Sequence, residues 1–114
     1  MAEIYDVLLS GGHVIDPKNK IDSVMDVAIK DGVIAAIEPK IESEAKKNVD
    51  VNGLIVTPGL IDIHMHAYAT PDNHDEWAGD NSILPDGFSF RSGVTTMVDT
   101  GSAGWRNFED FRRR

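Results

Sequence analysis

The stretch that decides the fold is PGLIDIHMH, residues 58–66, where an apolar strand pattern ends in two histidines one residue apart. Side chains alternate between the two faces of a strand, so Asp62, His64 and His66 share one face and the apolar residues between them share the other. At about 3.3 Å per residue, the Cα atoms of His64 and His66 lie roughly 6.6 Å apart, and two imidazoles at that spacing can converge on one ion about 2.1 Å from each nitrogen. The spacing predicts a metal-binding pair, with Asp62 as a buried partner of the strand or a supporting acceptor rather than a shared ligand.

The alternative to a metal-binding pair is a pair of solvated or hydrogen-bonded histidines. The position of the pair in the predicted fold favours metal binding. The strand is apolar on both faces, as in a parallel sheet covered by helices, and a polar loop follows it. Active sites of β/α barrels are built at the carboxyl ends of such strands. His13, beside a Gly-Gly pair that predicts a turn, and His74, in an acidic loop, have no such setting and are expected at the surface.

Downstream of the histidines the pattern predicts a β-loop-α-β unit. A short helix is expected over 83–92, closed by Gly93, and an apolar strand over 94–99 runs into the small-residue turn TGSAG at 100–104. A further helix is expected to start near Asn107, with acidic residues in its first turn and arginines after them.

Upstream, residues 4–56 are short β-branched runs broken by turn residues, which predicts an antiparallel sheet. Asp-Gly at 31–32 and Asn-Gly at 52–53 predict hairpin-type turns. One face of a small sandwich, whose second layer the sequence does not reveal, is expected to carry Val27, Ile29, Val33, Ile34 and Ile37. The predicted division is a β-sandwich segment at 1–57 and a β/α segment at 58–114.

Composition restricts the function classes. The chain has 11 Lys and Arg against 19 Asp and Glu, a net charge of −8, which argues against nucleic acid and an anionic membrane surface as partners. It contains no cysteine, so a metal must be held by imidazole and carboxylate groups. The first fifteen residues lack a basic region and a long apolar run, which argues against a signal peptide or membrane span and favours a cytoplasmic location.

The tract PGLIDIHMH, together with RSGVTTMVDTGSAG at 91–104, resembles the amino-terminal third of the amidohydrolase superfamily. It is most similar to the dihydroorotase, hydantoinase and deacetylase-like branch. The resemblance implies part of a small β-sandwich followed by the first β/α units of a (β/α)₈ TIM-type barrel. It also implies one or two divalent metal ions, most often zinc, and hydrolysis of the C–N bond of an amide or cyclic amide by a metal-activated water.

Carried over by position, the resemblance makes His64 and His66 metal ligands and Asp62 a supporting acid. Thr100, Gly101 and Ser102, at the end of the second barrel strand, are expected to shape the substrate pocket, although a tight structural turn explains them equally well. The implied partner is a small-molecule amide, and homo-oligomerisation is left open.

Two departures limit this assignment. Dihydroorotases usually carry an arginine two residues after the second histidine, whereas this chain has Tyr68, which favours an N-acyl amino acid or another small amide over dihydroorotate. The general base and further metal ligands are expected beyond residue 114, because a barrel needs about 250 residues. Asp72, His74 and Asp75 are the nearby alternatives, but loop acids are usually solvated. We therefore expect the isolated chain to be inactive.

Two other functions stay open. The chain could be noncatalytic and pair with a complementary partner through its exposed strands, or it could be part of a deaminase of the same superfamily that acts on a nucleobase-like ring.

Overall fold

The computed structural model describes residues 4–68 and 82–113, and the chain divides into two compact units, Met1–Pro58 and Gly59–Arg114. The predicted boundary between residues 57 and 58 lies one residue before this division. The expectations for Asp72, His74 and Asp75 fall outside the described residues.

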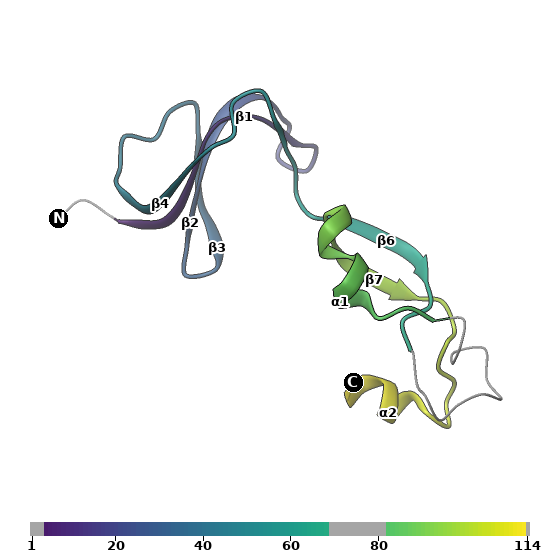
Figure 1. Ribbon diagram of the computed structural model, residues 1–114. Helices are drawn as coiled ribbons and strands as arrows, with labels where there is room; N and C mark the ends of the chain where they lie inside the picture. The colour runs from purple at the N-terminus through teal and green to yellow at the C-terminus, as the bar shows by residue number, and fades with distance from the viewer. Residues whose placement is uncertain (1–3, 69–81, 114) are drawn as a thin grey trace. The chain divides into compact units, whose positions relative to one another are not determined.

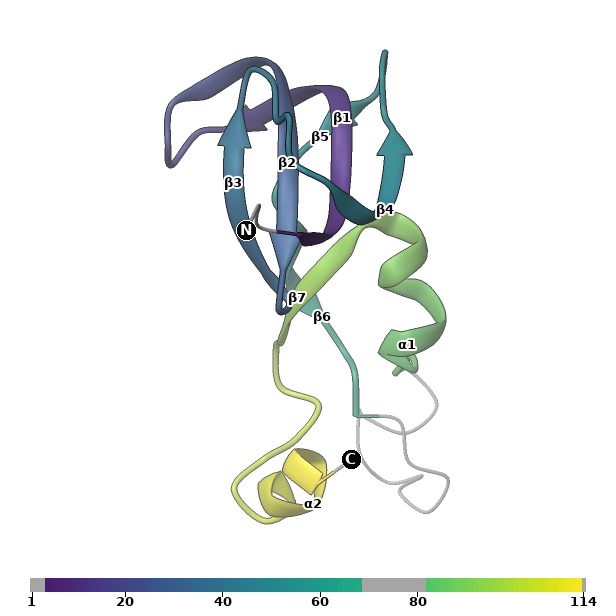
Figure 2. The same cartoon turned by 90° about the vertical axis from the view of Figure 1, so that its left-hand side faces the viewer.

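The first unit is a five-stranded mixed sheet with the order β3-β2-β1-β4, in which β5 also pairs with β1 (Figure 2). Its strands are β1 (Tyr5–Asp16), β2 (Ile21–Lys30), β3 (Val33–Glu38), β4 (Ala45–Asp50) and β5 (Ile55–Val56). The β1-β2 and β2-β3 pairs are antiparallel, as predicted, but β4 and β5 run parallel to β1. The prediction of a purely antiparallel sheet was wrong, because residues 39–44 carry the chain across to the other side of β1 instead of turning it back beside β3.

The two predicted hairpin turns have different outcomes. Asp31 and Gly32 have φ angles of 51° and 77° and join the antiparallel strands β2 and β3, which confirms a two-residue hairpin. At the second site only Gly53 has a positive φ, of 77°, and the turn joins β4 to β5. Both of those strands pair with β1 and not with each other, so this turn is not a hairpin.

The expected apolar face of the sheet is only partly buried. The buried cluster consists of Leu8, Ala28 and Ile41, and Val27 is also buried. Val33 and Ile34, in contrast, are 63% and 57% exposed, and the second layer of the expected sandwich stays a prediction. A register irregularity between Ala28 and Ile29 in the β2-β3 pair interrupts the alternation of faces.

The predicted turn at Gly11 and Gly12 is instead a bulge inside β1, where the pairing with β2 shifts between Leu9 and Gly12. Gly11 has a φ of 76° and donates its N–H to Asp26 Oδ1 at 2.8 Å, while Oδ2 of the same carboxylate accepts the N–H of Ile41 at 3.0 Å. Asp26 is 8% exposed, so one buried carboxylate holds both the bulge and the segment after β3.

The second unit contains two parallel strands, β6 and β7, which lie side by side (Figure 1). Its elements are β6 (Leu60–Met65), helix α1 (Pro85–Phe88), a 3₁₀ turn (Phe90–Ser92), β7 (Val94–Asp99) and helix α2 (Phe108–Arg113). Gly93 ends the 3₁₀ turn in the left-handed conformation, with a φ of 75°. These elements confirm the predicted order of strand, short helix, strand and helix.

Within residues 4–68 and 82–113, none of the helices is long and apolar enough to cross a membrane.

Candidate metal centre

The two histidines of the decisive stretch lie at the carboxyl end of β6. His64 is the last residue but one of the strand and is exposed, and His66 follows the strand and is half-buried. Their ring centroids are 6.0 Å apart and the ring planes are nearly perpendicular, at 82°. This spacing leaves room for one ion between two ring nitrogens at about 2.1 Å from each. The pair therefore fits two imidazole ligands of a divalent metal.

A hydrogen bond fixes one side of the His66 ring. Its Nδ1 lies 2.9 Å from Oγ of Ser102, a residue that follows β7 and is only 3% exposed. Histidines that bind metals usually have their second ring nitrogen held in this way, because the contact sets the orientation of the ring. The contact is thus a second observation compatible with a metal ligand at His66.

Asp99, the last residue of β7, organises the loop behind these groups. Its Oδ2 accepts the N–H of Ala67 at 2.8 Å, and its Oδ1 accepts the N–H groups of Gly101 and Ser102 at 3.0 and 2.7 Å. Partial burial acts to raise the pKa of Asp99, but the hydrogen bonds from Ala67, Ser102 and Gly101 outweigh it and hold the pKa below its ordinary value. The ionised carboxylate therefore ties the end of β6 to the turn after β7.

Asp62 and Thr100 contact the backbone of β6. Asp62 Oδ1 accepts the backbone N–H of His64 at 2.9 Å, so its hydrogen bond goes to the main chain of that histidine. Thr100 donates both its N–H and its hydroxyl to the carbonyl of Met65, at 3.0 and 3.3 Å. The predicted supporting role of Asp62 and the predicted substrate contacts of Thr100, Gly101 and Ser102 stay predictions.

The described part of the chain brings together no group of three or more His, Cys, Asp or Glu side chains that could hold a metal. A catalytic zinc site needs about three protein ligands besides an open position for water, and the assignment of His64 and His66 as two of them stays a prediction. The prediction that His13 lies at the surface is confirmed. Its Nε2 is 2.6 Å from Asp22 Oδ1, and the side chains of His13 and Asp22 are 47% and 77% exposed.

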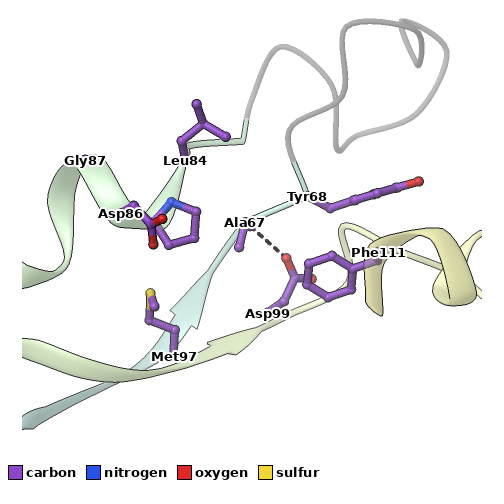
Figure 3. A pocket seen from close by; sticks show the side chains of 9 residues that line it. Ala67, Tyr68, Leu84, Asp86, Gly87, Met97, Asp99 and Phe111 are labelled. Carbon is purple, nitrogen blue, oxygen red and sulfur yellow. Dashed lines mark hydrogen bonds between the residues drawn. The ribbon is translucent and has the colours of Figure 1, made fainter. Parts of the chain in front are cut away.

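A cavity of about 680 Å³ lies in the second unit, between the strand ends and the two helices (Figure 3). Its lining includes Tyr68, Met97, Asp99 and Phe111 but neither histidine of the pair. Tyr68 is 3% exposed, donates its hydroxyl to Asp110 Oδ2 at 2.7 Å and packs its ring 5.2 Å from that of Phe111. The side chain at the position of the dihydroorotase arginine is thus a packed, hydrogen-bonded phenol.

Sequence reasoning missed the role of Asp99 and assigned Ser102 to substrate. The local signal was an aspartate at a strand end followed by Thr-Gly-Ser, because aspartate often accepts N–H groups from the two or three residues after it. The contact from Ser102 to His66 joins residues 36 apart in sequence, and only the pairing of β6 with β7 brings them together.

The sequence and the structure of the chain are similar to those of several known proteins. A dihydroorotase of Elusimicrobium minutum is 42% identical over 98 residues, which are 84% of this chain and 22% of that protein. Among solved structures, an adenine deaminase matches 96% of this chain and 27% of its own, with 28% identity and a TM-score of 0.74. The N-acyl-D-glutamate deacylase of Bordetella bronchiseptica, solved with zinc and a phosphonate inhibitor, matches 83% of this chain and 18% of its own, with 30% identity and a TM-score of 0.63. No protein-family model matches the sequence.

The chain belongs to the amidohydrolase superfamily. Within it, the chain corresponds to the amino-terminal portion of dihydroorotase-like and D-aminoacylase-like members, and it spans about a fifth of the length of the curated relatives it matches.

Proposed function

We propose that this chain forms the amino-terminal part of a metal-dependent hydrolase that cleaves the C–N bond of an amide or cyclic amide. The observation that carries the proposal is the pair His64 and His66 at the carboxyl end of a parallel strand, with ring centroids 6.0 Å apart. The zinc in the related deacylase supports the choice of metal. In this proposal the first unit belongs to a β-sandwich and the second begins a (β/α)₈ barrel, located in the cytoplasm.

The roles of the chain's own residues follow from their contacts. His64 and His66 would hold a shared ion, Ser102 Oγ makes a hydrogen bond with His66, and Asp99 accepts the N–H of Ser102. Asp62 restrains the backbone of His64. A bound zinc supplies Lewis-acid chemistry, because it polarises a carbonyl group and acidifies water. Two ligands do not complete a catalytic site, so activity requires further ligands and a general base that the described residues do not provide.

For the substrate we propose an N-acyl amino acid or a related small amide rather than dihydroorotate. A guanidinium binds a carboxylate through two parallel hydrogen bonds, and Tyr68 offers no such group. Its hydroxyl is already engaged by Asp110, and its ring packs against Phe111. An N-acyl amino acid also carries a carboxylate, so the choice of this substrate class is supported by the likeness to the N-acyl-D-glutamate deacylase and not by Tyr68.

Deamination of a nucleobase-like ring is the second candidate, because the adenine deaminase structure matches 96% of the chain. The same metal chemistry serves both reactions, so the described residues of the site fit either one.

The test uses the polypeptide at the length its host produces, loaded with zinc and assayed on N-acyl amino acids, dihydroorotate and adenine. We expect release of free amino acid, and we expect a chelator to stop it. His64→Ala should reduce the rate by at least 10²-fold, which is about 2.7 kcal/mol in activation free energy, because loss of a metal ligand removes the ion. Ammonia release from adenine, with acylamino acids untouched, would favour the deaminase. No turnover of any of the three, with zinc bound, would contradict the proposal.

A further inference from the structure

The turn between β4 and β5 contains Asn52 followed directly by Gly53, the one Asn-Gly pair of the sequence (Figure 2). Both residues are exposed. Leu54 donates its N–H to the carbonyl of Val51 at 3.0 Å, which closes the turn, and Gly53 occupies the third position with a φ of 77°. The turn therefore places an exposed carboxamide one residue before an exposed glycine.

The side chain of Asn52 and the nitrogen of Gly53 are both free to react. In the part of the chain that the structure describes, no hydrogen bond holds the Asn52 carboxamide or the N–H of Gly53. The bond at this turn comes from the main-chain N–H of Asn52, which Asp50 Oδ1 accepts at 2.9 Å. Asn19, in contrast, donates its side-chain amide to Asp16 Oδ2.

The space around the pair allows the glycine nitrogen to move towards the carboxamide. A Cβ added to Gly53 would meet nothing within 4 Å, so no neighbouring group blocks a rotation of the backbone there. Asn48 is the contrasting case, because it is also exposed but lies inside β4 and is followed by the β-branched Val49, which pairs with Leu9 of β1.

We propose that Asn52 is a site of spontaneous deamidation, with water as the co-reactant, and that it is converted to aspartate and isoaspartate. The Gly53 nitrogen attacks Asn52 Cγ, so that an N–Cγ bond forms and the Cγ–Nδ2 bond breaks. Nδ2 leaves as ammonia with the proton that the glycine nitrogen gives up. Water then opens the five-membered imide: addition at Cγ gives aspartate, and addition at the main-chain carbonyl carbon gives isoaspartate. No atom is oxidised or reduced.

Isoaspartate lengthens the backbone inside a turn whose two ends are fixed on β1. Before the turn, Val51 donates its N–H to the carbonyl of Ser10 at 3.0 Å, and after it the carbonyl of Leu54 accepts the N–H of His13 at 2.9 Å. An extra methylene group between these two bonds shifts Leu54 or breaks one of them, whereas aspartate adds charge without length. The modification therefore loosens β5, and this effect is independent of the proposed function.

The first test follows two peptides of the protein at the length its host produces, after incubation of the folded protein near pH 8. Cleavage before aspartate gives residues 31–49, which contain Asn48, and residues 50–61, which contain Asn52. Mass spectrometry should show acid at position 52 accumulating about 10-fold or more faster than at position 48, because Gly53 lacks the branched side chain of Val49. Aspartate at position 52 adds a cleavage site, whereas isoaspartate resists cleavage, which distinguishes the two products.

The matched control for this test is Asn52→Gln, whose longer side chain cannot form the five-membered imide and should keep its amide. Equal rates of conversion at positions 52 and 48 would overturn the inference. Conversion at position 52 that occurs only in urea would also overturn it, because the folded turn would then protect Asn52. Conversion of the Asn52→Gln variant at the rate of Asn52 would show that Gly53 is not the attacking group.

The second test measures the effect of the modification on the first unit by amide hydrogen exchange. Incubated protein enriched in isoaspartate is compared with the variant Asn52→Asp, which carries the same charge without the extra methylene group. We expect the amides of Val51 and His13 to lose protection in the isoaspartate form and to keep it in Asn52→Asp. Equal protection in the two proteins would overturn the inferred loosening of β5.

Discussion

At the scale of single residues, one aspartate in each unit accepts backbone N–H groups from two separate segments of the chain. Asp26 joins the β1 bulge to the segment after β3, and Asp99 joins the end of β6 to the turn after β7. In each case the carboxylate accepts backbone N–H groups that strand pairing leaves unsatisfied. The bonds from Gly11 and Ile41 to Asp26, and from Ala67 to Asp99, could not be predicted from the sequence, because they join segments that are distant along the chain.

Replacing Asp26 by asparagine should destabilise the first unit. An amide has one acceptor oxygen, so the N–H of Gly11 or that of Ile41 would face an NH₂ group in a buried setting. We expect a loss of about 1–3 kcal/mol in the free energy of unfolding, measured by urea titration followed by circular dichroism. Asp50→Asn, at an exposed turn, is the control, and a loss no larger than in that control would argue against the role of Asp26.

The pKa of Asp99 predicts a pH dependence for the second unit. Because the folded-state pKa lies below the ordinary value of 3.8, the ionised form stabilises the fold above about pH 4, and this contribution disappears as the pH falls through the folded pKa. Amide hydrogen exchange of β6 and β7, read between about pH 3 and pH 7 after correction for the intrinsic rate, should show the loss in acid. Asp99→Asn should remove this acid dependence; an unchanged dependence would assign it to other groups.

At the scale of elements, sequence patterns correctly predicted the features that depend on residues close together along the chain. The Asp31-Gly32 hairpin, the strand at 94–99, the cap at Gly93 and the last helix all depend on residues near in sequence, and all are confirmed. The parallel arrangement of β4 and β5 and the bulge at Gly12 depend on the path of the chain, which hydrophobic alternation does not encode.

The start of β6 packs tightly against β7 and offers a test. A Cβ on Gly59 would overlap the Thr95 side chain, reaching its fixed Cβ at 2.7 Å, whereas a Cβ on Gly87 in α1 would meet nothing within 4 Å. We expect Gly59→Ala to destabilise the second unit by about 1–3 kcal/mol and Gly87→Ala to be neutral or stabilising. Thermal unfolding that ranks the two variants in the opposite order would show that the two strands do not pack as described.

At the scale of the whole molecule, both strands of the second unit expose large apolar side chains. Ile61 and Ile63 on β6 are 63% and 75% exposed, and Val98 on β7 is 45% exposed. Apolar strand surfaces of this kind favour association. The relatives are about five times as long as the matched region.

The isolated chain should therefore associate in solution. We expect its mean mass in sedimentation equilibrium to rise with concentration, and Ile63→Lys to reduce that rise, because a charge on the exposed strand opposes pairing. Val24→Lys, at a position of comparable exposure in the first unit, tests whether the effect is specific to β6. A chain that stays monomeric at all concentrations would contradict this expectation.

The sequence therefore predicted the histidine pair and the elements around it, but not the groups that hold the pair in place. The distance between the two histidines of a His-x-His pair on a strand could be predicted, because the extended backbone fixes the distance between residues i and i+2. The contact of Ser102 with His66 and the bond from Ala67 to Asp99 arise from pairing between β6 and β7, which the sequence indicates only as a general parallel arrangement.

The central claim is that His64 and His66 bind a divalent metal together. Equilibrium dialysis against zinc, with metal counted by elemental analysis, tests it on the protein at the length its host produces, on the double variant His64→Ala, His66→Ala of that protein, and on His13→Ala as a surface control. We predict about one or two equivalents of zinc in the unaltered protein and in His13→Ala, and loss of that zinc in the double variant. Equal zinc content in all three proteins, or none in any, would contradict the claim and leave the two histidines as hydrogen-bonded residues of the strand end.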